Sequence, residues 1–470
     1  MKKKLLVPAG IVLVLAVAYC AGSWYTGKQA QAQVYDAVNQ INQQLDVSWP
    51  VGQTRPTLQI QDYQRGWFSS DVRYVFTFSD DSGHIQTLRL EDALQHGPFP
   101  WGALGAGDFR PLLAYSRIQL TPTEFVQPWF DAREGASPMQ IDTRVTFGGV
   151  AHSLWTFHPF AYDGEAGQID FSGGSVRVDY DRTLKKSDAQ GRFDSLKWAD
   201  GTGGQGTVTN FTVEGHNTVA AQGDIQVHNV VKVDRITAQH PDGPDLTIEN
   251  MAVKLDSART GVLLDGALAY EFGKIRIGHA DLGAIRAGMR AEHIDFIALE
   301  GLLAAWGQVS ADGEELDPDE EKQLEAPLRT MLASSPLLAV DPLGWTTSEG
   351  RTHALFSVHF KPAADAVPGP ADLGRLIEQS LRQVRLEVSV SRPMVIQLAG
   401  QISPEAGEQT RAIAAMLFDQ YAARLQQAGL VQVKDEVVSL NLSYAGGEVG
   451  LDDKRMSVQE FMALVQRVLG

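Results

Sequence analysis

Few residues in this sequence have the types and spacing that catalysis, cofactor binding or metal binding requires. The stretch Gly201-Thr202-Gly203-Gly204-Gln205-Gly206 has the letters of the glycine-rich loop that binds dinucleotides. Such a loop works only between a strand and a helix, whose first N–H groups point at the pyrophosphate. Residues 207–213 instead alternate as a strand does, so we interpret the glycines as a turn.

The titratable residues form no catalytic or metal-binding pattern. The eleven histidines include no pair at the spacing of a metal-binding helix, and His152 and His158 would lie about 20 Å apart along one strand. We interpret Asp62 and Asp71, which flank an expected hairpin turn, as solvated carboxylates rather than a catalytic pair. No Gly-x-Ser-x-Gly motif occurs, and the single cysteine, Cys20, excludes an intramolecular disulfide. We therefore predict no catalytic residue, no cofactor, no metal ion and no enzymatic activity.

Two short stretches rich in aromatic residues have the most unusual composition. The stretch Tyr63-Gln64-Arg65-Gly66-Trp67-Phe68 is followed about thirty residues later by His96-Gly97-Pro98-Phe99-Pro100-Trp101. Glycine lets the chain turn, aromatic rings can close one end of a sheet, and an arginine can stack on a ring. We predict a structural plug, with a recognition surface as the alternative. Its residues are Tyr63, Arg65, Gly66, Trp67, Phe68, His96, Gly97 and Pro98.

An uncharged run near the N-terminus predicts a membrane anchor. Residues 5–27 contain no charge and follow Lys2, Lys3 and Lys4. About 20 apolar residues span the roughly 30 Å hydrocarbon core as a helix, with aromatic rings at the interface and lysines on the cytoplasmic side. We predict a retained single-pass anchor that includes Leu5, Leu6, Ile11, Leu13, Leu15, Trp24 and Tyr25. The alternatives are a cleaved signal peptide with Ala16-Val17-Ala18 as its site, and a lipoprotein signal at Cys20, which the bulky Tyr19 disfavours.

The composition limits the class of protein and its partners. The chain has 57 acidic and 40 basic residues, and 44% of its residues are hydrophobic. This hydrophobic content can build a core and excludes disorder, and the length predicts two or three domains or one elongated sheet. The negative balance disfavours nucleic acid and anionic headgroups as partners.

The spacing of apolar residues changes along the chain. Residues 28–50 have helical spacing and predict a stalk, or else the first helix of the domain. Residues 51–298 alternate polar and apolar side chains and predict antiparallel strands. Within them, the same three-residue pattern occurs three times: a β-branched residue, any residue and then an asparagine, which is Asn210, Asn229 or Asn250. The pattern arises either by chance or from repeated hairpins. Residues 299–470 mix strands, including 394–398, with helices that begin near Pro318, near 371, near 403 and at Ser457.

The predicted fold is therefore β-dominated α+β. We expect a long twisted antiparallel sheet, with helices toward the C-terminal half and one N-terminal transmembrane helix. The predicted divisions are 1–27 for the cytoplasmic lysines and anchor, 28–50 for the helical stalk, 51–298 for the β-rich region and 299–470 for the mixed region.

The chain resembles the YdgA-like family of bacterial envelope proteins. The resemblance covers nearly the whole chain: the lysine-flanked anchor, both aromatic stretches, and an ending of strand 440–444, Ala445-Gly446-Gly447 and helix 456–469. Relatives tend to have an Asn-Gly turn before the last helix, where this chain has Leu451-Asp452-Asp453-Lys454. The resemblance implies a Gram-negative inner-membrane protein with a cytoplasmic N-terminus and a periplasmic body, which can be dimeric. It implies no catalytic residue.

Two classes of function fit these observations. The first is a non-catalytic envelope protein that binds a partner or forms a homodimer through its sheet or helices. The second is a lipid-handling protein that holds acyl chains in an apolar sheet groove. An open apolar trough along the sheet would favour lipid, whereas a closed core with an external apolar patch would favour a protein partner. A hydrolase is the third and least favoured alternative.

Overall fold

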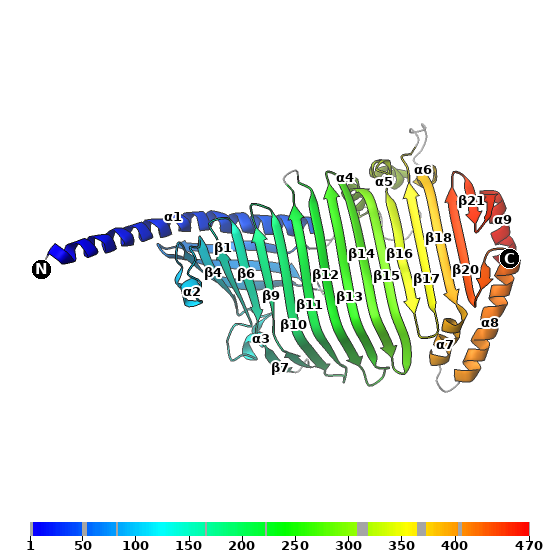
Figure 1. Cartoon of the computed structure of the whole chain (residues 1–470), viewed down its shortest axis with the longest axis horizontal. Helices are drawn as coiled ribbons and strands as arrows, with labels where there is room; N and C mark the ends of the chain where they lie inside the picture. Colours follow the sequence, from blue (N-terminus) through cyan, green and yellow to red (C-terminus); the bar gives the residue numbers. More distant parts are fainter. Residues whose placement is uncertain are drawn as a thin grey trace. The chain divides into compact units, whose positions relative to one another are not determined.

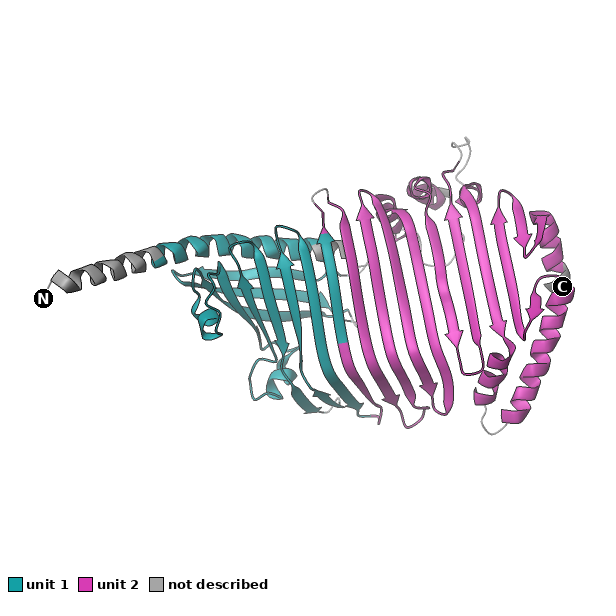
Figure 2. Ribbon diagram, viewed as in Figure 1, with its two compact units in different colours: residues 1–201, 212–218 teal, residues 202–211, 219–470 magenta. Residues whose placement is uncertain are grey.

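The computed structural model describes residues 3–48, 54–80, 83–164, 167–220, 223–307, 318–363, 373–402 and 407–469; within these ranges the side chains of 3–18, 44, 46–48, 402 and 467–469 are outside the description. The chain divides into two compact units (Figure 2). Unit 1 consists of residues 1–201 and 212–218, and unit 2 of residues 202–211 and 219–470. The boundary therefore falls within strand β11, Gln205–Val219.

Unit 1 is an antiparallel sheet with one long helix and two short ones (Figure 1). Its strands are β1 Thr57–Arg65, β2 Ser69–Ser79, β3 Ile85–His96, β4 Ala114–Thr121, β5 Met139–Val145, β6 Val150–Phe157, β7 Phe160–Gly164, β8 Gly167–Phe171, β9 Gly174–Asp181 and β10 Lys186–Asp200. The first six pair in chain order, after which β6 pairs with β9 and β10 pairs with both β9 and β8. The short helices are α2 Trp101–Gly105 and α3 Gln127–Asp131.

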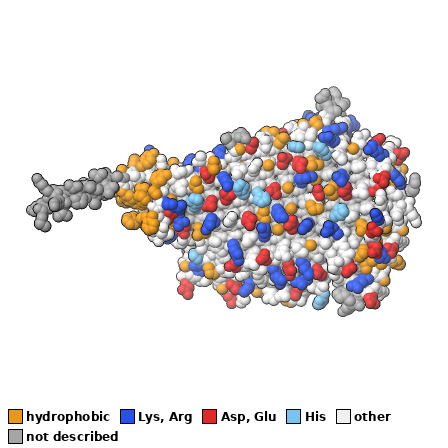
Figure 3. Space-filling model, viewed as in Figure 1, with side chains coloured by type: hydrophobic (Ala, Val, Ile, Leu, Met, Phe, Trp, Pro, Cys, Tyr) orange, Lys and Arg blue, Asp and Glu red, His pale blue; other side chains and the backbone are white. Residues whose placement is uncertain are grey.

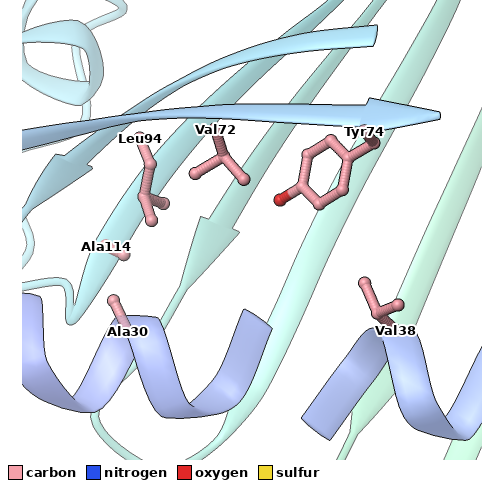
Figure 4. Close-up of a cluster of buried hydrophobic side chains, with 6 residues drawn as sticks. All are labelled: Ala30, Val38, Val72, Tyr74, Leu94 and Ala114. Carbon is pink, nitrogen blue, oxygen red and sulfur yellow. The ribbon is translucent and has the colours of Figure 1, made fainter. Parts of the chain in front are cut away.

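The long helix α1, Lys3–Ser48, supplies part of the core of unit 1. Its buried Ala30 and Val38 pack with Val72 and Tyr74 of β2 and with Leu94 of β3 (Figure 4). Because side chains alternate along a strand, β2 and β3 present every second residue to this helix. Burying each large aliphatic side chain contributes about 1.5–3 kcal/mol. Ala30 and Val38, within the range predicted as a stalk, therefore belong to the core of unit 1.

One polar residue of α1 covers the free side of β1. The Asn42 amide donates to the Leu58 carbonyl at 2.8 Å and accepts from the Leu58 N–H at 2.8 Å. The other side of β1 pairs with β2. The side chain therefore satisfies backbone groups that a neighbouring strand would otherwise bond.

Unit 2 is a second, longer run of antiparallel strands. Its strands are β12 Ile225–Gln239, β13 Leu246–Thr260, β14 Leu263–Ile277, β15 Ala280–Asp295, β16 Leu337–Thr346, β17 Arg351–Phe360, β18 Leu381–Ser391, β19 Gln432–Lys434, β20 Val437–Ala445, β21 Glu448–Leu451 and β22 Lys454–Ser457. From β12 to β18 each strand pairs with the next, and β18 then pairs with β20. The predicted β-dominated fold with a long antiparallel sheet is confirmed.

The described helices of unit 2 are α4 Phe296–Trp306, α5 Pro318–Ala333, α6 Leu373–Ser380, α7 Arg392–Ile402, α8 Gly407–Gln427 and α9 Val458–Leu469. The predicted capping box of α9 is confirmed, because the Glu460 N–H donates to Ser457 Oγ at 3.2 Å and the Ser457 N–H donates to Glu460 Oε2 at 2.8 Å. The helix starts expected near 371 and 403 fall outside the described residues, but α6 and α8 follow them.

Two local predictions differ from the structure. The strand expected at 394–398 is wrong, because these residues lie in α7. Pro393 stands in the first turn, where a proline favours a helix, and Met394 is buried at 1% exposure. Helix α4 was not expected; the Asp295 carboxylate begins it by accepting from the Ala298 N–H at 2.9 Å.

Two of the three asparagines have a left-handed backbone conformation within long strands. Asn210 of β11 and Asn250 of β13 adopt positive φ angles of 51° and 54°. Asparagine tolerates this left-handed conformation better than most residues do. Gly273 of β14 lies so close to Asn250 that a Cβ there would be 2.9 Å from the asparagine Cβ. At two of its three positions, the repeated asparagine therefore occupies a site where the backbone is left-handed.

Candidate functional site

Strands β1, β2 and β3 bring the two aromatic-rich stretches together at one end of unit 1. The Gly66 N–H donates to the Ser69 carbonyl at 2.8 Å and closes the turn between β1 and β2. The His96 N–H donates to the Phe68 carbonyl at 2.8 Å and joins the second stretch to the first. Any Cβ on Gly97 would overlap the carbonyl oxygen of Leu112, so this position requires glycine.

The imidazole of His96 is buried between the two stretches, at 1% exposure. Its Nε2 lies 2.8 Å from Ser70 Oγ, and its Nδ1 lies 3.4 Å from the Trp67 carbonyl. Burial lowers the pKa of His96, which favours the neutral ring. Nδ1 then donates to the carbonyl, and Nε2 accepts from the serine. Because Ser70 is also 1% exposed, this serine–histidine pair has no access to a substrate and serves the packing.

Helix α1 docks directly on these stretches. At Gly27, a Cβ would lie 2.5 Å from His96 Nδ1, and at Gly22 it would lie 3.7 Å from Pro98 Cδ. Between them, Thr26 Oγ1 is within hydrogen-bond distance of the Gly97 carbonyl, at 3.2 Å. The two stretches that were predicted to form a plug therefore lie where the N-terminal helix packs on the sheet.

Aromatic rings surround this docking site. The Tyr19 ring stacks on Phe68 at 5.8 Å, and the Arg65 guanidinium lies over the Trp24 ring at 5.6 Å. The Tyr63 ring lies 6.0 Å from the ring of Tyr35, which is also on α1. We call the exposed rings the aromatic collar; it comprises Trp24, Tyr25, Trp67, Phe68, Phe99, Trp101 and Phe109. Figure 3 shows hydrophobic side chains gathered where the described surface of α1 begins.

The predicted anchor overlaps the collar at Trp24 and Tyr25, which are 44% and 57% exposed. The side chains of Leu5, Leu6, Ile11, Leu13 and Leu15 fall outside the described residues. Their backbone belongs to α1, so the predicted N-terminal helix is present. Within the described part of the chain, no helix combines the length and the hydropathy needed to cross a membrane.

A buried carboxyl group lies deeper under α1. Asp92 of β3 is 3% exposed, and it accepts from Ser116 Oγ at 2.7 Å and from the Tyr74 hydroxyl at 3.2 Å. Burial raises the pKa of Asp92 from 3.8 to about 6, despite these bonds. Asp92 could not be identified from sequence patterns, because its burial depends on the helix that covers it.

Unit 2 has an apolar stripe that the sequence analysis did not resolve. We call it the apolar row: Leu255, Leu268, Met289, Val340, Phe356, Leu386 and Leu442. Each residue lies directly opposite the next on the adjacent strand, so all share one face of β13 to β18 and β20. At about 4.8 Å between strands, the row runs roughly 29 Å across the sheet. Met289 is 50% exposed and Phe356 is 44% exposed, so the described chain leaves the row open.

The opposite face of these strands is charged. Lys254, beside Leu255 in the sequence, pairs with Glu271 at 2.9 Å, and Arg290, beside Met289, pairs with Glu292 at 3.2 Å. Figure 3 shows charged side chains spread over the strands of the face in view. An antiparallel sheet with one polar and one apolar face normally covers the apolar one. In the described residues the apolar row stays exposed.

The other residues considered in the sequence form no reactive site among the described residues. The glycine-rich stretch is a turn, because β10 ends at Asp200 and β11 follows. His152 Nδ1 lies 2.6 Å from Asp179 Oδ1 in a shallow cleft of about 300 Å³, and Asp62 pairs with Arg73 at 3.6 Å. No cluster of three or more histidine, cysteine or acidic side chains in the described ranges could hold a metal ion.

Comparison with known proteins decides the family. The family model "Bacterial protein of unknown function (DUF945)" matches residues 1–459. The chain belongs to this family. It is 24% identical to Protein YdgA of Escherichia coli K12, over 98% of this chain and 96% of that protein. It is 22% identical to Uncharacterized protein YihF of the same organism, over 97% of this chain and 98% of that protein. The YdgA-like resemblance is confirmed.

A third relative covers less of the chain. It is an uncharacterized protein of Haemophilus influenzae, 24% identical over 38% of this chain and 48% of that protein. No solved structure matches the chain. The names of these relatives therefore indicate a family but no activity.

Proposed function

We propose that this DUF945 protein is a membrane-anchored envelope protein that handles lipid, with acyl chains held on the apolar row of unit 2. The proposed location is the inner membrane, with a cytoplasmic N-terminus and the bulk of the chain in the periplasm. The proposed role is non-catalytic. The observation that carries the proposal is the open, continuous apolar row.

The dimensions of the row suit an acyl chain. One leaflet of a bilayer provides roughly 15 Å of hydrocarbon, half of the roughly 30 Å core. The row is about twice that length, so one extended chain can lie along it without reaching an end. At about 25 cal/mol per Å² of apolar surface, covering Met289, Phe356 and their neighbours provides binding energy without any polar group.

The membrane in which the chain is proposed to be anchored is the source of the ligand. The part of the uncharged run that precedes the contacts of Tyr19 with unit 1 is proposed to insert into the membrane, which keeps unit 2 on the same tether as a reservoir of acyl chains. Unbranched or rotatable side chains such as Met289 adapt to ligands of varied shape. The pairing of charges on the opposite face restricts apolar binding to one side of the sheet.

The experiment is lipid extraction and mass spectrometry of the full chain purified in mild detergent. We expect roughly stoichiometric phospholipid or fatty acid with the native chain, and a several-fold loss in Met289→Glu and Phe356→Asp. Ser357→Asp is the matched control, because Ser357 lies on the other face opposite Arg385. Lipid retained equally by all three variants, or absent from the native chain, would exclude the apolar row as the binding site.

A second candidate function rests on helix α8. Its exposed residues Ile413, Met416, Leu417 and Tyr421 form one apolar stripe at helical spacing. Such a stripe suits a second copy of the chain or another envelope protein. Met416→Lys would then convert a dimer to a monomer in sedimentation experiments, whereas Gln426→Lys, at an exposed position on the opposite side of the helix, would not.

A further inference from the structure

We propose that the aromatic collar of unit 1 is a docking surface for the bilayer interface, which holds this unit against the membrane from which α1 emerges. The inference rests on the membrane location in the proposed function but not on lipid binding by unit 2. It concerns rings from three separate segments: α1, the β1–β2 turn and the segment between β3 and β4 that contains α2.

The collar residues are too exposed to be only a plug. Trp67 is 65% exposed, Trp101 72% and Phe109 73%, whereas His96 in the same stretches is 1% exposed. The buried residues already complete the packing between α1 and the sheet. Three large exposed aromatic side chains at one end of a unit are costly in water and therefore indicate a partner.

The sequence of α1 indicates that the partner of the collar is a lipid bilayer. The uncharged run of residues 5–27 includes Tyr19 and Trp24, which contact Phe68 and Arg65 of the sheet. A bilayer that surrounds the beginning of this run therefore reaches the collar at its surface. A second protein copy on the collar would have to share this space with lipid.

The chemistry of the collar matches the interface. Tryptophan rings prefer the headgroup region, where an apolar body meets a wet edge. Arg65 on Trp24, and Arg110, which pairs with Asp108 at 2.8 Å, place guanidinium groups among the rings at the depth of the lipid phosphates. Arg65 supplies local positive charge in a chain of net charge −17, whereas Asp108 balances the charge of Arg110.

The test uses the full chain in phosphatidylcholine vesicles whose lipids carry bromine near the headgroup end of the acyl chains. Bromine quenches only tryptophans at that depth. We expect quenching of the native chain, and the double variant Trp67→Phe, Trp101→Phe should lose at least half of it while keeping the signal of Trp24. Trp155→Phe, which removes a 37% exposed tryptophan of β6 in unit 1, should lose none of it.

The outcomes separate the two proposals. Quenching that is unchanged in the double variant overturns the docking surface but leaves the anchor, because Trp24 alone then accounts for the signal. Absence of quenching in the native chain overturns both the membrane location and the collar inference. Circular dichroism of each variant checks that the chains are folded.

Discussion

Gly27 of α1 and His96 of β3 lie in such close contact that a Cβ on Gly27 would be 2.5 Å from the imidazole Nδ1. This contact joins the N-terminal helix to the second aromatic stretch at a point where no side chain fits. Since His96 is held by Ser70 and by the Trp67 carbonyl, the ring has little freedom to move away.

Gly27→Ala should therefore destabilise the chain. An added methyl group in a packed site typically costs about 1–3 kcal/mol, which exceeds the gain of up to about 1 kcal/mol from replacing glycine in a helix. Chemical unfolding of the full chain in detergent measures the change. The matched control is Gly22→Ala, where the nearest atom is 3.7 Å away and stability should hold or rise. Equal effects of the two substitutions would show that His96 does not confine Gly27.

The second prediction concerns pH. Because the pKa of Asp92 is raised in the folded chain, its contribution to stability is complete below about pH 4 and is lost as the pH rises through about 6. This loss corresponds to roughly 3 kcal/mol. Asp92→Asn should remove that fall, so the variant gains stability relative to the native chain between pH 4 and pH 7. Unfolding free energies measured across this range provide the test; a pH slope identical in both chains would contradict it.

The third prediction concerns the edge of β1. Asn42→Leu removes both bonds to the Leu58 backbone and should cost about 1–2 kcal/mol, since a partly buried N–H and C=O lose their partner. The exchange of the Leu58 amide hydrogen should accelerate in the same variant. Gln43→Leu, at the exposed neighbouring position, should change neither quantity. Unchanged exchange at Leu58 in Asn42→Leu would show that the amide does not secure this edge.

Sequence patterns predicted the positions of strands and helices better than they predicted which of these elements pack together. Alternation over 176–180 indicated the strand that became β9, and Ser457 with Glu460 predicted the cap of α9, because both signals are local. The helix that contains Met394 was not predicted, because a short apolar run does not distinguish a strand from a helix.

The sites depend on pairings between distant residues. The aromatic stretches were recognisable as a unit, but their contact with Gly27 joins residues that lie far apart in the chain. The apolar row required the register itself, which places Leu268 opposite Met289 and Phe356 opposite Leu386. A shift of one residue would turn any of these side chains to the charged face, so composition alone could not locate the row.

The most direct test of the account is photo-crosslinking in cells. A photoreactive amino acid replaces Phe356 on the apolar row in one variant of the full chain, and Ser357 on the charged face in another. Irradiation followed by mass spectrometry of the purified chain identifies the adducts. Lipid adducts at position 356 and none at 357 are the expected result. Adducts at both positions, or only protein adducts at 356, would contradict lipid binding on the apolar row.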